Sequence, residues 1–508
     1  ILIIAFAVII RFSMMSSHSL WLDEQLSLTR IDGSNLGVVL DQLKATQYDK
    51  YQPIYFISLF FWQKLFGDSV SAARALSAFF GGLSVVLAIT TASKIYGRTY
   101  GLWTALLVSF SAFHVYYSQE VRAYALVMFI ASLELLCFSV IRFTENKKTT
   151  IYTLFFWIIV IFGFLSSLFI VFLTLSICIA DWFIKRKFKN WTFFWSPLLV
   201  CSLPALYLYL SSPYWQNLSF YLSSGLETWS GTHILQNILF SIYGLLVGTT
   251  YSIPIDQLRY NQVNVVADYW MYIGLFLFAS SVIGVGVIRR VINREEATSN
   301  ENITQNDHSL GQANTFFFLL IITAFAVSTV FTLLTNINWA PRHSAYIYPA
   351  IAVLLPSSFC FPEPRKSWAR AVRKSSLVGV FLLIALNIYS LNNYFFNPAH
   401  ARDDYRSAAQ YVMKQSSPDS SSVLLWGEVK ILRRYGDTKT EKMDLGGIQP
   451  EALPEALLAF TDNADRITVL VNREYLLGYS VEPAISTQYD LQKKVEFSYF
   501  DIYELEQK

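Results

Sequence analysis

The sequence predicts a mainly helical, polytopic membrane protein with a small α/β domain at its C-terminus. Of its 508 residues, 54% are hydrophobic and 16% aromatic, and the mean hydropathy is +0.39. Charged residues make up 15% of the chain, against roughly 25% in soluble domains. Apolar runs recur until about residue 393, where the composition becomes more polar. The net charge of +3 is too small to indicate a nucleic-acid partner.

A helix needs roughly 17–25 mainly apolar residues to cross a bilayer. The chain begins at Ile1 inside an apolar run without a small-residue cleavage site, so we expect a helix whose first residues are missing rather than a signal peptide. About eleven transmembrane helices are predicted, near 1–15, 72–94, 100–117, 123–142, 151–165, 167–184, 192–211, 267–289, 315–335, 344–361 and 375–392.

Short loops rich in Lys and Arg lie on one side of these helices, and the positive-inside rule places them in the cytoplasm. We therefore expect an integral protein of the cell (inner or plasma) membrane. The opposite, extracytoplasmic face then receives the loop with Asp23, the loops with Glu120 and Arg342, and the C-terminal tail. The basic loops contain Lys94, Arg98, Arg142, Lys147, Lys148, Lys185, Arg186, Lys187, Lys189, Arg289, Arg290, Arg294, Arg365, Lys366, Arg370, Arg373 and Lys374.

The first outer loop, 16–71, carries two amphipathic or aromatic stretches. Apolar residues recur at helical spacing near 36–43, and 55–66 is aromatic but short. A crossing there would break the charge asymmetry, so both are predicted to be interfacial helices. The same reasoning makes 233–247 interfacial or re-entrant. The stretch Gly67-Asp68-Ser69 is predicted to supply a cap for the next helix.

The C-terminal part, 394–508, is predicted to be an extracytoplasmic α/β domain, and 1–393 the membrane domain. An amphipathic helix is expected over 403–414, with strands at 422–425, 467–471 and 495–503. The domain has no glycine-rich phosphate loop. The four cysteines of the chain lie in apolar runs without metal-ligand spacing, so we expect them to pack as small hydrophobic residues: Cys137, Cys178, Cys201 and Cys360.

Asp23 and Glu24 follow the first apolar segment closely, with Trp21 beside them. Charge this near hydrocarbon is costly and is often functional. A carboxylate can take the proton of an acceptor hydroxyl, and a pair can bind a divalent metal. A solvated loop end remains the alternative. His18 is a weak further metal ligand, so a site of Asp23, Glu24 and His18 for Mg, Mn or Zn stays open.

Two more clusters face the same side. Tyr117, Gln119, Glu120 and Arg122 join two apolar helices, and Arg342 and His343 follow a proline. A guanidinium suits a phosphodiester because it donates several hydrogen bonds. Aromatic-belt and interfacial-anchor roles are the alternatives.

Arg11 and Arg74 lie within predicted helices and are further candidates. A cation in an apolar helix usually has a partner, and an outer-loop carboxylate is the expected one.

Several of these blocks, in order, resemble glycosyltransferase family 39. They are Ser19–Glu24, Gln52–Phe56, Lys64–Ser69, Ala73–Ala78 and Phe113–Tyr124, and the Arg342 block resembles a late Arg-Tyr element. The resemblance implies the GT-C fold class, which includes protein O-mannosyltransferases and the lipid A aminoarabinose transferase. Its members transfer a sugar from a polyprenyl phosphate outside the cytoplasm, with inversion.

By position, the resemblance implies that Asp23 is the base and Glu24 its supporting or metal-binding neighbour. Glu120 and Arg122 would belong to the second-loop part of the site. Arg74 and Arg342 would hold the lipid phosphate, with Arg122 and His343 beside them.

Three departures concern the acceptor and any metal. Gln52-Pro53 replaces the usual Pro-Pro, Leu165–Phe169 stands where a Thr-His-Tyr element is common, and His343 replaces Tyr.

The sequence thus predicts a polyprenyl-phosphate-sugar-dependent hexosyl- or pentosyltransferase acting on a glycan, lipid or protein hydroxyl. The alternatives are a lipid-linked-sugar transporter or flippase, and a non-catalytic assembly subunit. Transporters tend to show repeated halves and charges at mid-membrane, neither of which is evident here.

Overall fold

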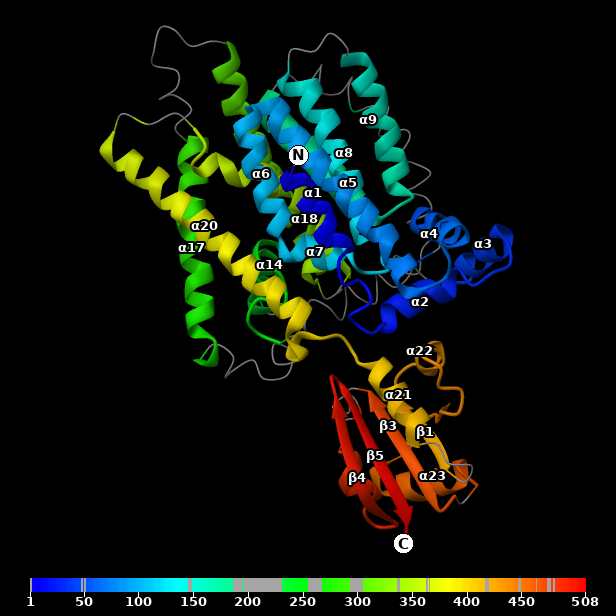
Figure 1. Ribbon diagram of the computed structural model, residues 1–508. Coiled ribbons are helices and arrows are strands. Elements are labelled where there is room, and N and C mark those ends of the chain that lie inside the picture. Colours follow the sequence, from blue (N-terminus) through cyan, green and yellow to red (C-terminus); the bar gives the residue numbers. More distant parts are fainter. Residues whose placement is uncertain are drawn as a thin grey trace. The chain divides into compact units, whose positions relative to one another are not determined.

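The computed structural model describes most of the chain (Figure 1). The described residues are 2–46, 49, 52–144, 149–185, 195, 231–254, 267–292, 305–335, 339–361, 364, 366–415, 420–445, 449–462, 464–472, 477 and 480–508. They form two compact units. One contains Ile1–Ser13 and Arg30–Tyr394, and the other contains Met14–Thr29 and Phe395–Lys508.

The first unit is helical. Its helices are α1 (Leu2–Phe12), α3 (Leu36–Lys44), α4 (Pro53–Phe66), α5 (Val70–Tyr96), α6 (Arg98–Phe110), α7 (Ala112–Ser118), α8 (Tyr124–Phe143), α9 (Thr149–Phe164), α10 (Leu168–Lys185), α14 (Gly231–Val247), α17 (Trp270–Ile292), α18 (Gln305–Thr335), α19 (Tyr348–Leu354) and α20 (Ser367–Phe396). In Figure 1, α1 lies against α5 and α6, and α5 runs beside α8.

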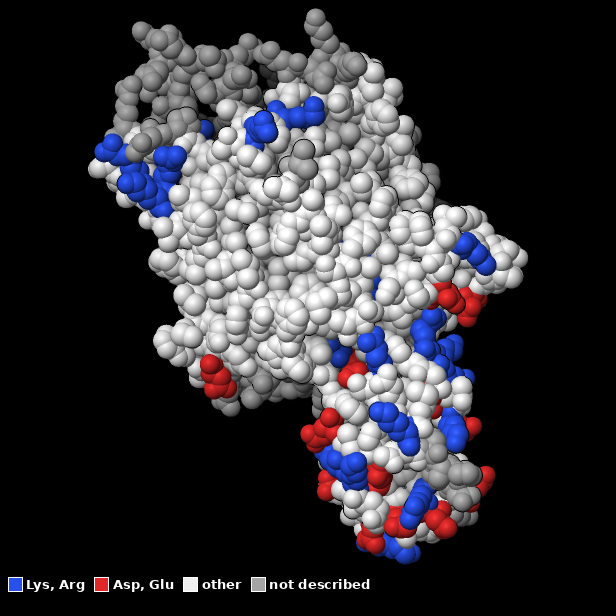
Figure 2. Space-filling model, in the orientation of Figure 1, with Lys and Arg blue, Asp and Glu red and all other residues white. Residues whose placement is uncertain are grey.

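Among the described helices, five are long and apolar enough to cross a membrane: Val70–Tyr96, Tyr124–Phe143, Trp270–Ile292, Leu310–Leu333 and Ser367–Phe396. Shorter apolar helices cover Leu2–Phe12, Thr150–Phe164, Leu168–Ile184 and Leu235–Val247. Figure 2 shows a broad face of this unit without charged side chains. The expected fold class, a mainly helical membrane protein with a small α/β domain, is confirmed.

Two predicted helices are interrupted. The helix expected over 100–117 breaks at Ser111, whose hydroxyl caps α7 by accepting from the amide of His114 at 3.2 Å. The prediction of one helix over 344–361 is wrong. The chain there forms the 3-10 turn Pro341–Ile347, then α19, then the 3-10 turn Leu355–Ser358. Pro349 and Pro356 each lie at the second position of a new segment, because proline lacks the amide that a continuing helix needs.

Of the other expectations, the cap before Val70 is confirmed and the remaining two are not tested. Ser69 caps α5 by accepting from the amide of Ala72 at 3.1 Å. The stretches expected to be interfacial are α3, α4 and α14, and their depth in a membrane stays a prediction. The segment 192–211 lies outside the described residues except for Trp195.

The second unit combines α2 (Leu22–Arg30), most of which lies within Met14–Thr29, with an α/β domain. A five-stranded sheet has the order β2-β1-β3-β5-β4. Its strands are β1 (Ser420–Trp426), β2 (Glu441–Lys442), β3 (Arg466–Asn472), β4 (Tyr489–Phe497) and β5 (Phe500–Gln507). The helices are α21 (Tyr405–Gln415), α22 (Val429–Arg434), α23 (Leu453–Phe460) and α24 (Val481–Ile485).

Strands β1, β2 and β3 are parallel, and β3, β5 and β4 are antiparallel. Alternate residues of the strands pack with α23 and α24 into one core, which includes Val469, Leu457 and Ile485. Helix α21 is amphipathic as expected, and its Tyr405 ring lies 4.7 Å from that of Phe500. The single strand expected over 495–503 is wrong, because the chain reverses between β4 and β5 at Tyr499, where φ is +59°.

The sequence assigns all of 16–71 to the membrane domain, whereas the contacts of Met14–Thr29 join it to the C-terminal unit. The chain then re-enters that unit at Phe395.

Candidate functional site

The turn Pro341–Ile347 is the centre of the site in the first unit, and α8, α10 and α14 pack against it. The amide of Ala340 donates to His343 Nδ1 at 3.0 Å, and the amide of His343 donates back to the Ala340 oxygen at 2.9 Å. A neutral imidazole has one acceptor nitrogen and one N–H. Because Nδ1 accepts, Nε2 bears the proton, and the 3.4 Å approach of Arg342 Nε to it is a close contact between two donors.

Aromatic rings enclose His343. The ring centroids of Phe169 and Trp339 each lie 5.4 Å from that of His343, and Trp339 Nε1 donates to Ser344 Oγ at 2.8 Å. Phe169 belongs to the 165–169 stretch that departs from the family pattern, so the structure brings two of the three departures into contact.

The pKa of His343 is lowered to about 3, first because burial disfavours the charged imidazolium and then because Arg342 and Arg122 place positive charge nearby. Two guanidinium groups from distant parts of the sequence therefore act on one neutral histidine. The arrangement concentrates positive charge around the turn, as an anion site requires.

The second-loop residues complete this cluster. The amide of Arg122 donates to the Glu120 oxygen at 2.7 Å, and Glu120 is buried. The charges of Glu120 and Arg342 both act on the hydroxyl of Tyr117. The structure thus brings together five of the predicted site residues: Tyr117, Glu120, Arg122, Arg342 and His343.

Arg74 lies near the start of α5 and is buried. One turn later, Ser77 Oγ donates to the Arg122 oxygen at 3.5 Å and lies 3.2 Å from the hydroxyl of Tyr55. These contacts join α4 and α5 to the second loop.

Arg11 has different partners from those expected. It donates to His114 Nδ1 at 3.2 Å, to the Val108 oxygen at 2.9 Å and to the Ala7 oxygen. His114 Nε2 lies 2.7 Å from Ser84 Oγ. The expectation of an outer-loop carboxylate as its partner is therefore corrected: these hydrogen bonds of Arg11 go to neutral groups of α1, α6 and α7, which hold the three helices together.

Gln119 also joins helices. Its Nε2 donates to the oxygens of Ile10, Arg11 and Ser13 at 3.2, 3.1 and 2.7 Å. Its Oε1 accepts from the hydroxyl of Tyr394 at 3.1 Å. Gln119 therefore fixes the end of α1 beside α7 and α20, one residue before Glu120.

In the second unit, Asp23 and Glu24 occupy the first turn of α2, where negative charge favours the helix dipole. Successive residues of a helix point about 100° apart. Glu24 is fully buried, and its carboxylate lies 2.9 Å from Arg402 Nη1. Asp23 is half-buried. Two adjacent carboxylates are thus in different environments.

The neighbours of this pair have structural contacts. Trp21 precedes α2, and its carbonyl accepts from the amide of Gln25 at 3.1 Å. His18 is buried. Within the described ranges, no three His, Cys, Asp or Glu side chains converge as metal ligands would. Because Arg402 already neutralises Glu24, the set Asp23, Glu24 and His18 does not fit a divalent metal.

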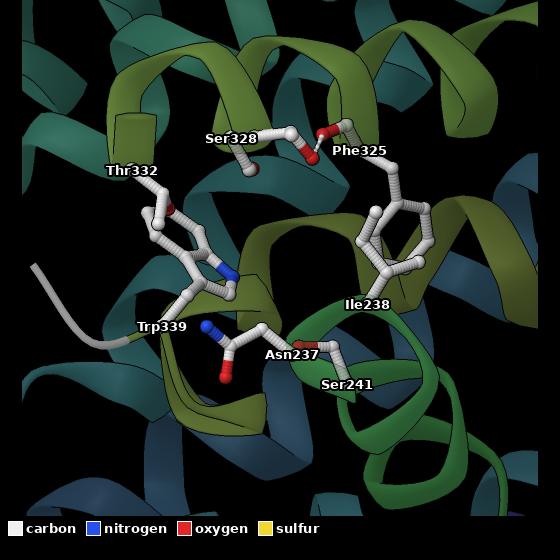
Figure 3. Close-up of a pocket in the computed structure, with 8 residues that line it drawn as sticks. Asn237, Ile238, Ser241, Phe325, Ser328, Thr332 and Trp339 are labelled. Carbon is white, nitrogen blue, oxygen red and sulfur yellow. Dashed lines mark hydrogen bonds between the residues drawn. The ribbon is translucent and has the colours of Figure 1, made fainter. Parts of the chain in front are cut away.

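A small pocket adjoins Trp339 between α14 and α18 (Figure 3). Asn237 and Ser241 of α14 face Ser328 and Thr332 of α18 across it. Within the described chain, the buried hydroxyls of Ser241 and Thr332 make no hydrogen bond. This pocket was not predicted from the sequence, although hydroxyl and amide groups in apolar helices were an available signal.

Arg402 was also missed. It lies in the short link between α20 and α21 and has no local signal that distinguishes it from a surface arginine.

Comparison with known proteins gives a match at the level of fold. No family model and no curated protein matches the sequence. The crystal structure of ArnT from Cupriavidus metallidurans bound to undecaprenyl phosphate aligns with a TM-score of 0.53 and 12% identity, over 99% of this chain and 97% of that chain. The apo structure of the same protein aligns with a TM-score of 0.56, with the same identity and coverage. The mainly helical architecture, the C-terminal sheet and this full-length match together show that the chain has the same fold as ArnT.

Proposed function

We propose that this protein transfers a sugar from a polyprenyl-phosphate-linked donor to an acceptor hydroxyl at the extracytoplasmic face of a membrane. The main support is the convergence of Arg122 and Arg342 on one buried turn, in a fold whose ArnT example was crystallised with undecaprenyl phosphate. A polyprenyl donor is confined to the bilayer, so its phosphate is presented at the membrane surface. Cations held there by membrane helices would receive it.

In the proposed reaction, Asp23 takes the proton of the acceptor hydroxyl as its oxygen attacks the anomeric carbon. The bond between that carbon and the phosphate oxygen breaks, and the phosphate leaves with the electron pair. One bond forms and one breaks on opposite faces of the sugar, so the configuration inverts.

The guanidinium groups have the second role. Negative charge grows on the leaving phosphate oxygen during the reaction, and Arg342, Arg122 and Arg74 would stabilise it more in the transition state than in the ground state. Neutral His343 can donate from Nε2 to a phosphate oxygen without adding charge. Glu120 would orient the arginines or the acceptor. Since the carboxylates do not fit a metal, the proposal includes no metal step.

The test is an assay of purified protein with a radiolabelled polyprenyl phosphate sugar and membrane extracts as acceptor. Removing a general base typically costs about 10²–10⁴ in rate, so Asp23→Asn should lose transfer on that scale. Asp32→Asn changes an exposed carboxylate of the same loop and is the matched control. Near-normal turnover of the Asp23 variant would refute its role.

The transporter alternative predicts another result. Liposomes containing the protein would then move the labelled lipid between leaflets without releasing labelled product. Sugar transfer to an acceptor, lost in the Asp23 variant, excludes that reading.

A further inference from the structure

We propose that the C-terminal domain is a clamp that holds the first-loop segment Met14–Thr29, and with it Asp23, in one conformation. This role rests on the proposed function, because it concerns the positioning of the base. The proposed reaction uses no side chain of the described strands of the C-terminal sheet. Its contacts with the first-loop segment indicate what it does.

The first contact is the buried ion pair. Glu24 and Arg402 have side-chain exposures of 0% and 5%, and their charged atoms are 2.9 Å apart. A buried pair contributes little net stability compared with apolar residues, but removing one partner leaves the other charge buried without its counter-charge, which is unfavourable. Any movement of α2 that separates Glu24 from Arg402 would leave a buried charge unpaired. The ion pair therefore disfavours other positions of α2.

The second contact is Arg406, at the start of α21. Its amide donates to Ser19 Oγ at 3.2 Å, and its Nη2 donates to the oxygens of Ser16 and His18 at 2.7 and 3.3 Å. One side chain and one amide of the C-terminal domain thus satisfy polar groups over four residues of the first-loop segment.

The third contact is Tyr435, which follows α22. Its hydroxyl accepts from the amide of Leu20 at 2.8 Å, and the Arg406 guanidinium lies 5.3 Å from its ring centroid. Leu20 is fully buried. Arg434 Nε adds a bond to Gln25 Oε1 at 3.3 Å.

These contacts bracket Asp23. Leu20 is held three residues before it, Glu24 immediately after it and Gln25 one residue later. Each interaction joins residues far apart in the sequence; Arg406 and Ser19, for example, are 387 positions apart. A segment held on both sides has few accessible conformations. The conformational entropy of Asp23 is therefore lost when the protein folds, and it does not add to the barrier of each turnover. Arg402, Arg406 and Tyr435 are therefore positioning residues.

The experiment measures the first-loop segment directly in the full-length protein. Hydrogen exchange of residues 16–29 is compared for wild type, Arg402→Met and Tyr435→Phe. Arg466→Met is the control, because Arg466 is an exposed arginine of the same domain with 72% side-chain exposure. Amides of β3 and β5 report whether the domain is folded.

Loss of one clamp contact should speed exchange in residues 16–29 on the order of tenfold, since that is about 1.4 kcal/mol of local opening. Exchange in β3 and β5 should stay unchanged. In the transfer assay, kcat should fall while KM for the lipid donor stays within about twofold, because the base and not the phosphate site is displaced. The double variant Glu24→Arg with Arg402→Glu swaps the two charges. It should restore part of the protection of residues 16–29 from exchange and part of kcat.

The outcomes separate the two proposals. Unchanged exchange in both variants would overturn the clamp, whatever the activity. Faster exchange with wild-type kcat would overturn the positioning role. Faster exchange in a protein whose wild type transfers no sugar would leave the clamp standing and refute the proposed function. If Arg402→Met fails to fold, Tyr435→Phe, which loses only one hydroxyl, decides the question.

Discussion

The carboxylate of Glu24 lies 2.9 Å from the guanidinium of Arg402, and both side chains are withdrawn from solvent. Its neighbour Asp23 is only half-buried. A sequence with two adjacent carboxylates suggests that they share one task, such as binding a metal. The structure separates them, since Glu24 anchors α2 and Asp23 remains the candidate base.

This division predicts opposite effects for two similar substitutions. Glu24→Gln leaves the Arg402 charge buried without its counter-charge and should lower the free energy of unfolding by about 3–5 kcal/mol. Asp23→Asn should leave the unfolding temperature nearly unchanged while transfer is lost. Thermal unfolding in detergent, measured together with transfer, checks this. Equal unfolding temperatures for the two variants would contradict it.

A second prediction concerns the cations. Arg342→Gln and Arg122→Gln should each weaken binding of undecaprenyl phosphate about tenfold or more, because a hydrogen bond to a charged group contributes about 1.5–3 kcal/mol. A lysine at either position should restore only part of the binding affinity, since an ammonium group cannot form the bidentate hydrogen bonds of a guanidinium. Binding is measured by titration in detergent. Arg98→Gln, which changes an exposed arginine, is the control, and a similar loss there would argue for a non-specific charge effect.

His343 gives a third prediction. Its pKa is lowered to about 3 in the folded protein by burial and by Arg342 and Arg122, against about 6.5 in the unfolded chain. Between these values the unfolded chain binds a proton that the folded chain does not. The free energy of unfolding should therefore fall as pH falls below about 6.5, by up to 1.4 kcal/mol per pH unit.

His343→Gln removes this proton, so its unfolding temperature should fall less than that of wild type between pH 6.5 and pH 4.5. Unfolding curves at both pH values give the comparison. Parallel loss of stability in the two proteins would show that His343 does not carry the effect.

A fourth prediction tests the packing behind Arg342. A Cβ on Gly244 would lie 2.6 Å from Cβ of Pro341, closer than such atoms approach. Gly244→Ala should push α14 from the turn, lower the free energy of unfolding by about 1–3 kcal/mol and reduce phosphate binding.

Gly274→Ala is the matched control, because a Cβ there meets no atom within 4 Å and α17 gains a better helix former. It should be neutral or slightly stabilising. If Gly244→Ala leaves the free energy of unfolding and phosphate binding as unchanged as this control does, the close contact with Pro341 does not constrain α14.

The fifth prediction concerns the pocket beside Trp339. Thr332 has a buried hydroxyl without a hydrogen bond in the described chain, and such a group costs about 1–3 kcal/mol. Thr332→Val keeps the shape and removes the hydroxyl, so it should raise the unfolding temperature. Thr329, whose hydroxyl donates to the Phe325 oxygen at 2.8 Å, is the control. A higher unfolding temperature for Thr329→Val alone would contradict this reading.

Local patterns predict most of the helices correctly. Apolar runs place α5, α8, α10 and α20, the stretch Gly67-Asp68-Ser69 predicts a cap for α5, and the 3.6-residue period predicts the buried face of α21. These features depend on neighbouring residues, so the sequence contains them directly. The prolines in 344–361 are also a local signal, and they mark the breaks in this stretch. A prediction from hydropathy alone gives one helix there.

The candidate site was predictable in its chemistry but not in its partners. Charges beside apolar runs identify Asp23, Glu120, Arg122 and Arg342, because burying them is costly wherever the chain folds. The sequence does not show which groups these charges contact. That Arg11 donates to His114, that Phe169 packs on His343, and that Arg402 pairs with Glu24 depend on contacts between distant segments.

The sequence by itself therefore determined the apolar helices, the α/β tail and the residue types of the candidate site, since hydropathy and charge act locally. Only the tertiary structure decided that Met14–Thr29 belongs with the C-terminal domain and that two arginines converge on one histidine. The physical reason is that a buried polar group must find a partner, but its own sequence neighbourhood does not say which one.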